Sequence, residues 1–119
     1  MIVSVFRRRL RAGVSFDDFI RAWEADKGFG VAARVFNAVS MEDPQEILSI
    51  GFVDVDASAF RSALESVVEQ EAVRHSRIEA VIESTTLRAW FDLKTGHDFT
   101  GDPREIEIAS AESLLASLN

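Results

Sequence analysis

The 119-residue sequence contains no cysteine and no tyrosine, and it has only two histidines and two prolines. The absence of cysteine excludes disulfide bonds, thiolate nucleophiles and zinc sites with sulfur ligands. Basic residues number 13 against 20 acidic ones, which gives a net charge of −7. Because binding to a phosphate backbone requires a basic surface, nucleic acid is not expected as a partner.

Long apolar runs are also absent. No run approaches the roughly 20 residues of a transmembrane helix, so no membrane partner is expected. The apolar residues 2–6 precede the first arginines, which is the reverse order of a secretory signal, and the protein is predicted to be cytoplasmic. The 47% of apolar and 28% of charged residues are typical of a globular protein, and the length predicts one domain.

Residues 1–29 predict a strand, a glycine turn and an amphipathic helix. Ser15 is a suitable N-cap, and acidic residues 17–18 match the positive end of the helix dipole. Lys27 and Gly28 predict the last turn and a left-handed stop. One face of this helix carries four apolar residues at helical spacing: Phe16, Phe19, Ile20 and Trp23.

Residues 32–41 and 47–55 predict two strands of an antiparallel hairpin, separated by a polar turn that contains Pro44. Gly51, inside the second of these strands, indicates either a bulge or a close approach by a bulky group.

A second helix is predicted to begin near Asp56 or Ser58, and residues 74–76 indicate a break. Its apolar stripe consists of Phe60, Leu64, Val67 and Val68, whereas Glu65, Glu69 and Glu71 are predicted to lie mainly away from it. The capping-box spacing of Ser76 and Glu79 predicts a short new helix, and a strand over residues 77–83 is the alternative.

Residues 85–93 predict another strand, and residues 94–103 a loop. Residues 105–109 predict a short edge strand, and Ser110 is expected to cap a last short helix. We therefore predict a main domain over residues 1–99 and a C-terminal extension over residues 100–119.

The predicted order of elements indicates an α+β protein with a ferredoxin-like layout, an antiparallel sheet with helices on one face. Several strands carry apolar residues on both faces, and helices can cover only one. Because large exposed apolar patches are rare on monomers, a second copy of the chain is expected to cover the other face.

The sequence resembles the dimeric α/β barrel superfamily, nearest to small bacterial proteins of the antibiotic-biosynthesis-monooxygenase type. The resemblance covers residues 1 to about 99 and rests on RLRAGVSFDDFIRAW, on IGFVDV and on RHSRIEAVIESTTLRAWFDLKTGHDF. It implies two ferredoxin-like subunits that pair as a barrel, with a pocket between helices and sheet in each. Relatives include cofactor-independent oxygenases of aromatic substrates, haem-degrading enzymes, isomerases and proteins without known activity.

Haem-degrading relatives use an Asn on the first strand with a Trp and a His further on. Here Ser4 is the only uncharged polar residue of the first strand, and the third strand has no Trp. Haem degradation is therefore not expected, and no cofactor is predicted. Oxygenases of this type tend to place Asn, Trp and Tyr around the substrate, and this chain has no tyrosine.

Two residues are candidates for chemistry, His75 as a base and Asn37 as a polar contact. A C-terminal helix histidine and an internally hydrogen-bonded asparagine are the structural alternatives. Five residues are candidates for lining a ligand pocket: Phe6, Trp23, Asn37, Phe52 and Trp90. Ordinary core packing is the alternative for the aromatic ones. His97 lies far from His75 in the sequence, and no metal site is predicted.

The arginines at positions 7, 8, 9 and 11 form the only basic run. Since alternation divides them between two faces, a solvated strand end is favoured over an anion-binding patch.

Two functions remain open. One is a cofactor-independent monooxygenase or isomerase of an aromatic or polyketide-like compound. The other is a non-catalytic homodimeric module that binds a small apolar or aromatic ligand or a protein.

Overall fold

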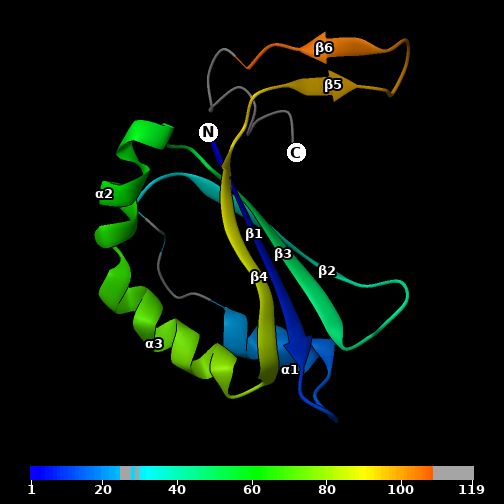
Figure 1. Ribbon diagram of the computed structural model, residues 1–119, viewed down its shortest axis with the longest axis vertical. Helices are drawn as coiled ribbons and strands as arrows, with labels where there is room; N and C mark the ends of the chain where they lie inside the picture. Colours follow the sequence, from blue (N-terminus) through cyan, green and yellow to red (C-terminus); the bar gives the residue numbers. More distant parts are fainter. Residues whose placement is uncertain (25–27, 29, 109–119) are drawn as a thin grey trace.

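The chain folds into a four-stranded sheet with helices on one face (Figure 1). The structure is a computed structural model and describes residues 1–24, 28 and 30–108. The elements, in chain order, are β1 (Ile2–Leu10), α1 (Phe16–Trp23), β2 (Ala33–Val39), β3 (Glu46–Val53), the 3-10 helix η1 (Ala57–Ala59), α2 (Phe60–Glu65), α3 (Val68–Glu79), β4 (Ile82–Asp92), β5 (Gly96–Asp98) and β6 (Arg104–Ile106).

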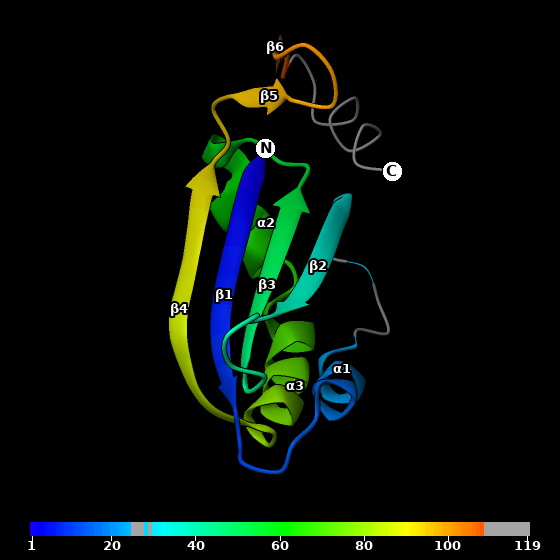
Figure 2. The ribbon, with the colours of Figure 1, turned by 90° about the vertical axis from the view of Figure 1, so that its right-hand side faces the viewer.

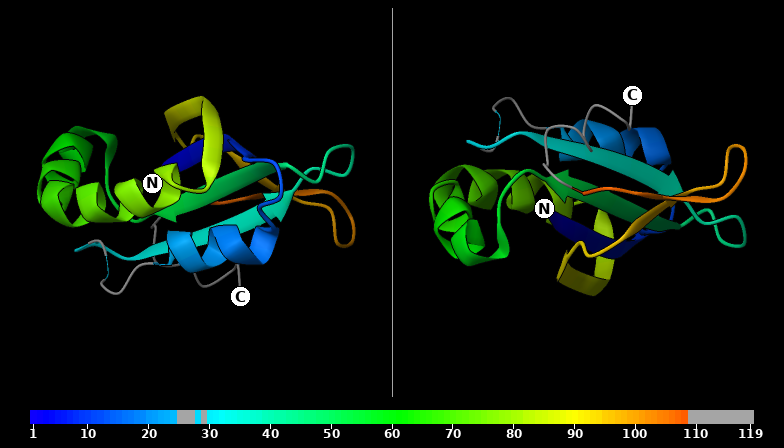
Figure 3. Two further views of the ribbon diagram at one scale, coloured as in Figure 1. Left: turned by 90° about the horizontal axis from the view of Figure 1, so that it is seen from below. Right: turned by 90° about the horizontal axis from the view of Figure 1, so that it is seen from above.

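The strand order in the large sheet is β2-β3-β1-β4, and every neighbouring pair is antiparallel. Figure 2 shows the four strands side by side with α2 and α3 behind them. Helix α1 packs against α3 (Figure 3). This is the ferredoxin-like arrangement that the order of elements predicted, and that prediction is confirmed.

Helix α1 begins as the sequence predicted. The backbone N–H of Asp18 donates to Ser15 Oγ at 3.1 Å, and the N–H of Ser15 donates to Asp18 Oδ2 at 3.0 Å, which completes a capping box. The predicted end of the helix is wrong, because α1 stops at Trp23 and Gly28 does not adopt the left-handed conformation. Lys27 lies outside the described residues.

The second helical region differs from the prediction. The break falls at Ser66 and Val67, between α2 and α3, and α3 runs without interruption through residues 74–76. Ser76 does not cap a new helix, since its hydroxyl donates to the Ala72 carbonyl one turn earlier. Residues 77–83 contain both the last turn of α3 and the start of β4, so neither single interpretation was right.

Residues 94–103 are not all loop, because they contain β5, which pairs with β6. This hairpin projects from the end of the sheet at which β4 finishes (Figure 1). It spans the predicted domain boundary at residue 99, and that boundary stays a prediction. The helix predicted from Ser110 onward lies outside the described residues.

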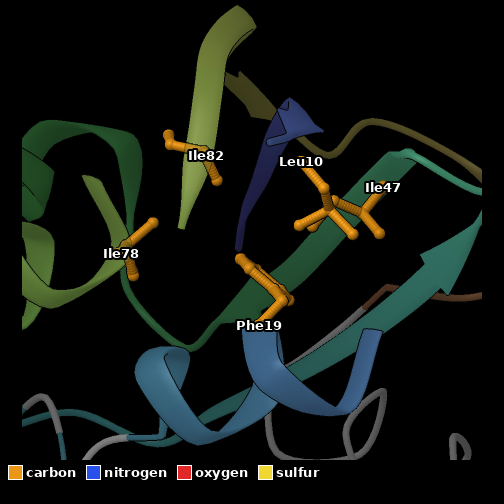
Figure 4. Close-up of a cluster of buried hydrophobic side chains, with 5 residues drawn as sticks. All are labelled: Leu10, Phe19, Ile47, Ile78 and Ile82. Atoms are coloured by element: carbon orange, nitrogen blue, oxygen red, sulfur yellow. The ribbon is translucent and has the colours of Figure 1, made fainter. Parts of the chain in front are cut away.

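Strand alternation divides the apolar residues between the two faces of the sheet. Between the helices and the sheet lies a core of five buried side chains, Leu10, Phe19, Ile47, Ile78 and Ile82 (Figure 4). Each of these residues comes from a different element, so the core joins α1 and α3 to the three strands β1, β3 and β4. Burial of their apolar surface is the main force that holds the layers together.

Gly51 marks a close approach between strands, and β3 has no bulge there. A Cβ at this position would clash with Ser4 Oγ on β1 and contact Val35 Cγ2 on β2 at 3.5 Å. We expect Gly51→Ala to lower the free energy of unfolding by about 1–3 kcal/mol through this overpacking, measured by urea denaturation.

Two further variants test whether the clash with Ser4 causes this loss of stability. The double variant Ser4→Ala/Gly51→Ala removes the clashing hydroxyl and should recover most of the loss. Gly101→Ala adds the same methyl where no atom of the described residues lies within 4 Å, and it should change stability by less than about 0.5 kcal/mol. A double variant as unstable as Gly51→Ala would contradict the explanation.

Candidate functional site

A cavity of about 340 Å³ lies between the sheet and helices α2 and α3. Its wall is mainly apolar and includes four aromatic side chains, Phe6, Trp23, Phe60 and Trp90. Six polar or charged residues also contribute, namely Ser4, Ser49, Glu71, Arg74, His75 and Arg88. A largely apolar pocket with a few polar groups is the usual form of a small-molecule site.

Trp90 is the centre of the aromatic wall. Its ring lies 5.7 Å from that of Phe6 in an edge-to-face contact and 5.8 Å from that of Phe60. The three rings come from β4, β1 and α2, so the wall joins the sheet to the helical layer. Such pairs hold each ring in a defined orientation, which favours a flat, apolar ligand.

His75 and Glu71 lie one turn apart on α3, and both line the cavity. His75 Nε2 is 3.6 Å from Glu71 Oε2, which is longer than a hydrogen bond. Burial lowers the pKa of His75 below its ordinary value of 6.5; Glu71 opposes this effect, and three nearby arginines add to it. The imidazole is therefore neutral near pH 7 and able to accept a proton.

Glu71 is held in the cavity wall by Arg74. Its Oε2 accepts a hydrogen bond from Arg74 Nη1 at 2.6 Å, and Arg74 Nε donates to the Trp23 carbonyl at the same distance. The other carboxylate oxygen, Glu71 Oε1, is buried and has no hydrogen-bond partner in the described part of the chain. The prediction that Glu71 lies away from the apolar stripe is wrong, because its side chain pairs with Arg74 and lines the cavity.

Two further arginines lie around Phe6. Arg8, from the same face of β1, has its Cζ 4.9 Å from the centroid of the Phe6 ring, and Arg88 of β4 has its Cζ 5.6 Å from that centroid. Arg8 is only 5% exposed. The prediction that the arginine run is a solvated strand end is wrong for Arg8 and describes Arg7, which is exposed and pairs with Glu46.

The predicted pocket residues divide between the two faces of the sheet. Phe6, Trp23, Trp90 and the candidate base His75 all line the cavity. Phe52 lies on the opposite face, where its ring is 6.2 Å from Phe36 in an edge-to-face contact.

Asn37 is satisfied within the protein. Its Oδ1 accepts a hydrogen bond from Ser49 Oγ at 2.6 Å, and it does not line the cavity. Asp92 pairs with Lys94, whereas Arg88 packs on aromatic rings.

Sequence reasoning missed Arg8, Arg88, Glu71 and Ser49 as cavity or near-cavity groups. One signal was present, because Ser4, Phe6 and Arg8 share a strand face that alternation alone identifies. No residue near Arg8 in the sequence indicated that the helices would cover this face as far as Arg8.

Within residues 1–24, 28 and 30–108, no three His, Asp or Glu side chains lie close enough together to hold a metal ion.

Comparison with solved structures identifies a similar fold. The chain is similar to a crystal structure described as a "putative Antibiotic biosynthesis monooxygenase" from Chloroflexus aurantiacus J-10-fl, with a TM-score of 0.56 and 17% sequence identity. The match covers 82% of this chain and 96% of the other. The two proteins share a fold. At this identity the likeness assigns no reaction.

No protein-family profile matches the chain, and no curated protein sequence matches it significantly. None of the helices in the described part is long and apolar enough to cross a membrane.

Proposed function

We propose that this protein is a small-molecule enzyme that removes a proton from an aromatic or polyketide-like hydroxy compound without a cofactor. The observation that carries the proposal is the position of His75, next to Glu71, in the wall of an aromatic-lined cavity. The solved structure with the same fold, described as a monooxygenase, is consistent with this class of reaction.

In this proposal His75 is the general base. Its lowered pKa keeps the imidazole neutral near pH 7, and Glu71 stabilises the imidazolium that forms when the proton is taken. The aromatic wall holds the substrate ring beside the base. The oxyanion produced spreads its charge onto the ring carbons, so it can react with O₂ in an oxygenase or be reprotonated at one of these carbons in an isomerase.

We also propose that two copies of the chain pair through the sheet face opposite α2 and α3, which no helix of the described residues covers. That face carries apolar side chains from all four strands, including Phe36, Leu87 and Phe91, which are 48%, 41% and 53% exposed. Pairing would bury this surface, which is unusually apolar for a free monomer. It would leave the helix face, and with it the cavity, on the outside of each sheet.

A second candidate function is a non-catalytic module that binds an aromatic ligand. The 3.6 Å separation between His75 and Glu71 favours it, because the imidazole does not donate a hydrogen bond to that carboxylate and is not held by it. Both functions use the same cavity, and turnover distinguishes them.

Turnover of a panel of hydroquinones and hydroxynaphthoquinols tests the catalytic proposal through O₂ consumption and product analysis by mass spectrometry. We expect His75→Gln to lower kcat/KM by at least about 100-fold, since a positioned general base contributes that much. Because protonation disables the base and the pKa is lowered, kcat/KM should fall only as pH drops below 6.5.

His97→Gln is the matched control. His97 is exposed in the β5–β6 hairpin, away from the cavity lining, so this variant should retain full activity and the same pH profile. Ligand binding without turnover of any compound in the panel would favour the non-catalytic module. Turnover that His75→Gln does not affect would contradict the assignment of His75 as the base.

A further inference from the structure

Arg8 is a buried cation with few partners. Its guanidinium donates one hydrogen bond, from Nη1 to Ser49 Oγ at 3.3 Å, and no carboxylate in the described residues lies within ion-pair distance. The Ser49 hydroxyl donates its own proton to Asn37 at 2.6 Å, so it is oriented to accept from Arg8. A buried guanidinium carries five N–H donors, and this arrangement leaves most of them for another acceptor.

Arg88 provides a second guanidinium beside the first. It lies directly opposite Phe6 across the β1–β4 ladder, and Arg8 is two residues along on the same face of β1. Both guanidinium groups lie over the Phe6 ring, and Arg88 also lies 5.4 Å from the centroid of Trp90. Arg88 forms no ion pair among the described residues.

These two arginines line a second, smaller cavity of about 70 Å³, together with His75 and Glu79. The small cavity shares Phe6, His75 and Arg88 with the aromatic cavity, so the two are adjacent. Glu79 is exposed and pairs with neither arginine in the described structure. A ligand with its ring in the large cavity could therefore place one small polar group between the arginines.

The charge at this end of the site is positive. Burial lowers the pKa of Arg8 to about 10, and the guanidinium groups of Arg74 and Arg88 add to that effect more than Glu71 opposes it. Arg8 still carries its charge at neutral pH. Arg74 is already engaged by Glu71 and the Trp23 carbonyl, which leaves Arg8 and Arg88 as the cations that an anion would compensate.

We propose that Arg8 and Arg88 bind the carboxylate of an aromatic acid, so that the ligand of the large cavity is an aryl carboxylate. The planar forks of two guanidinium groups suit a carboxylate, whose oxygens accept several hydrogen bonds at once. The inference rests on the proposed function for the cavity itself, and it adds the anionic group of the substrate and the residues that select it. It also places that group beside His75, at the end of the cavity where proton transfer is proposed.

Calorimetric titration with naphthoate and with its neutral isostere naphthamide tests this assignment. The two probes have the same ring and nearly the same shape, and they differ in charge. The wild-type protein is expected to bind naphthoate about 10- to 100-fold more tightly, which is the usual contribution of charge-assisted hydrogen bonds. Raising the salt concentration should reduce this preference in part, because Arg88 is exposed to solvent whereas Arg8 is buried.

Arg88→Met retains an unbranched side chain next to Phe6 and should weaken naphthoate binding far more than naphthamide binding, so that most of the preference for naphthoate is lost. Arg8→Met should do the same; because Arg8 is buried and this variant risks misfolding, Arg88→Met is the deciding one. Arg21→Met is the matched control, since Arg21 is exposed on α1 and pairs with Asp18. It should keep the full preference.

Equal affinity for the two probes, or a preference that survives in Arg88→Met, would overturn the carboxylate assignment and leave the cavity's proposed role intact. Binding of neither probe would contradict the aromatic cavity of the proposed function, and with it this inference. If the protein prefers naphthoate but turns over no compound, the carboxylate assignment is supported and only the catalytic proposal is contradicted.

Discussion

Ile50→Asp is expected to convert the proposed homodimer into a folded monomer. Ile50 lies at the middle of the sheet face opposite the helices, between Val5 on β1 and Phe36 on β2. In a symmetric dimer each copy would bring one new carboxylate into the apolar interface. Because an unpaired charge is very costly to bury, we expect the dissociation constant to rise by more than about 1,000-fold.

Light scattering and sedimentation equilibrium at micromolar concentration measure this effect. Circular dichroism should show an unchanged fold, because the substituted side chain faces away from the helices and the core. Val73→Asp places the same charge on α3, where the side chain is 67% exposed, and this control should stay dimeric. A wild-type protein that is monomeric, or an Ile50→Asp variant that remains dimeric, would contradict pairing through this face.

Phe19→Ala is expected to lower the free energy of unfolding by about 3–5 kcal/mol. Phe19 is 0% exposed, and in Figure 4 its ring lies among the other buried side chains of the core. Its removal leaves a cavity at the place where α1 meets the sheet, and the surrounding elements can close it only in part. Since a domain of this kind is stable by about 5–15 kcal/mol, the loss is a large share of the total.

Guanidinium denaturation followed by circular dichroism measures this loss. Phe99→Ala is the matched control, because Phe99 is 73% exposed beside the β5–β6 hairpin and the same truncation there should cost less than about 0.5 kcal/mol. Similar losses for the two variants would show that Phe19 is not the residue that joins α1 to the sheet.

Local patterns predicted the elements whose signals are contained in a few neighbouring residues. The N-cap at Ser15 and the apolar face that contains Phe19 predicted α1, and the hairpin of β2 and β3 followed from two apolar runs around a polar turn. The order of these elements then predicted the ferredoxin-like layout. Each of these signals acts through backbone geometry or side-chain period, which do not require knowledge of distant residues.

The errors arose where a distant contact overrode the local signal. Ser76 and Glu79 have capping-box spacing, yet α3 continues through them because Arg74 and Ile78 are buried on the face that packs toward α1 and the sheet. The β5–β6 hairpin was missed because its strands are three residues each and gain their order from pairing with one another.

The burial of Arg8 and Glu71 in the candidate site depends on tertiary structure. In the sequence, one belongs to a basic run and the other to an acidic helix surface, and both residue types are usually solvated. Their burial depends on how far α2 and α3 extend across the sheet, which no residue near either of them specifies.

The sequence by itself determined the class of fold and the sets of residues that share each face of the sheet. Alternation and helical period assign a residue to a face, and these rules are local. Only the tertiary structure decided where on that face the cavity opens and which charges are buried beside it. Those properties depend on the packing of α2 and α3 against strands far away in the chain.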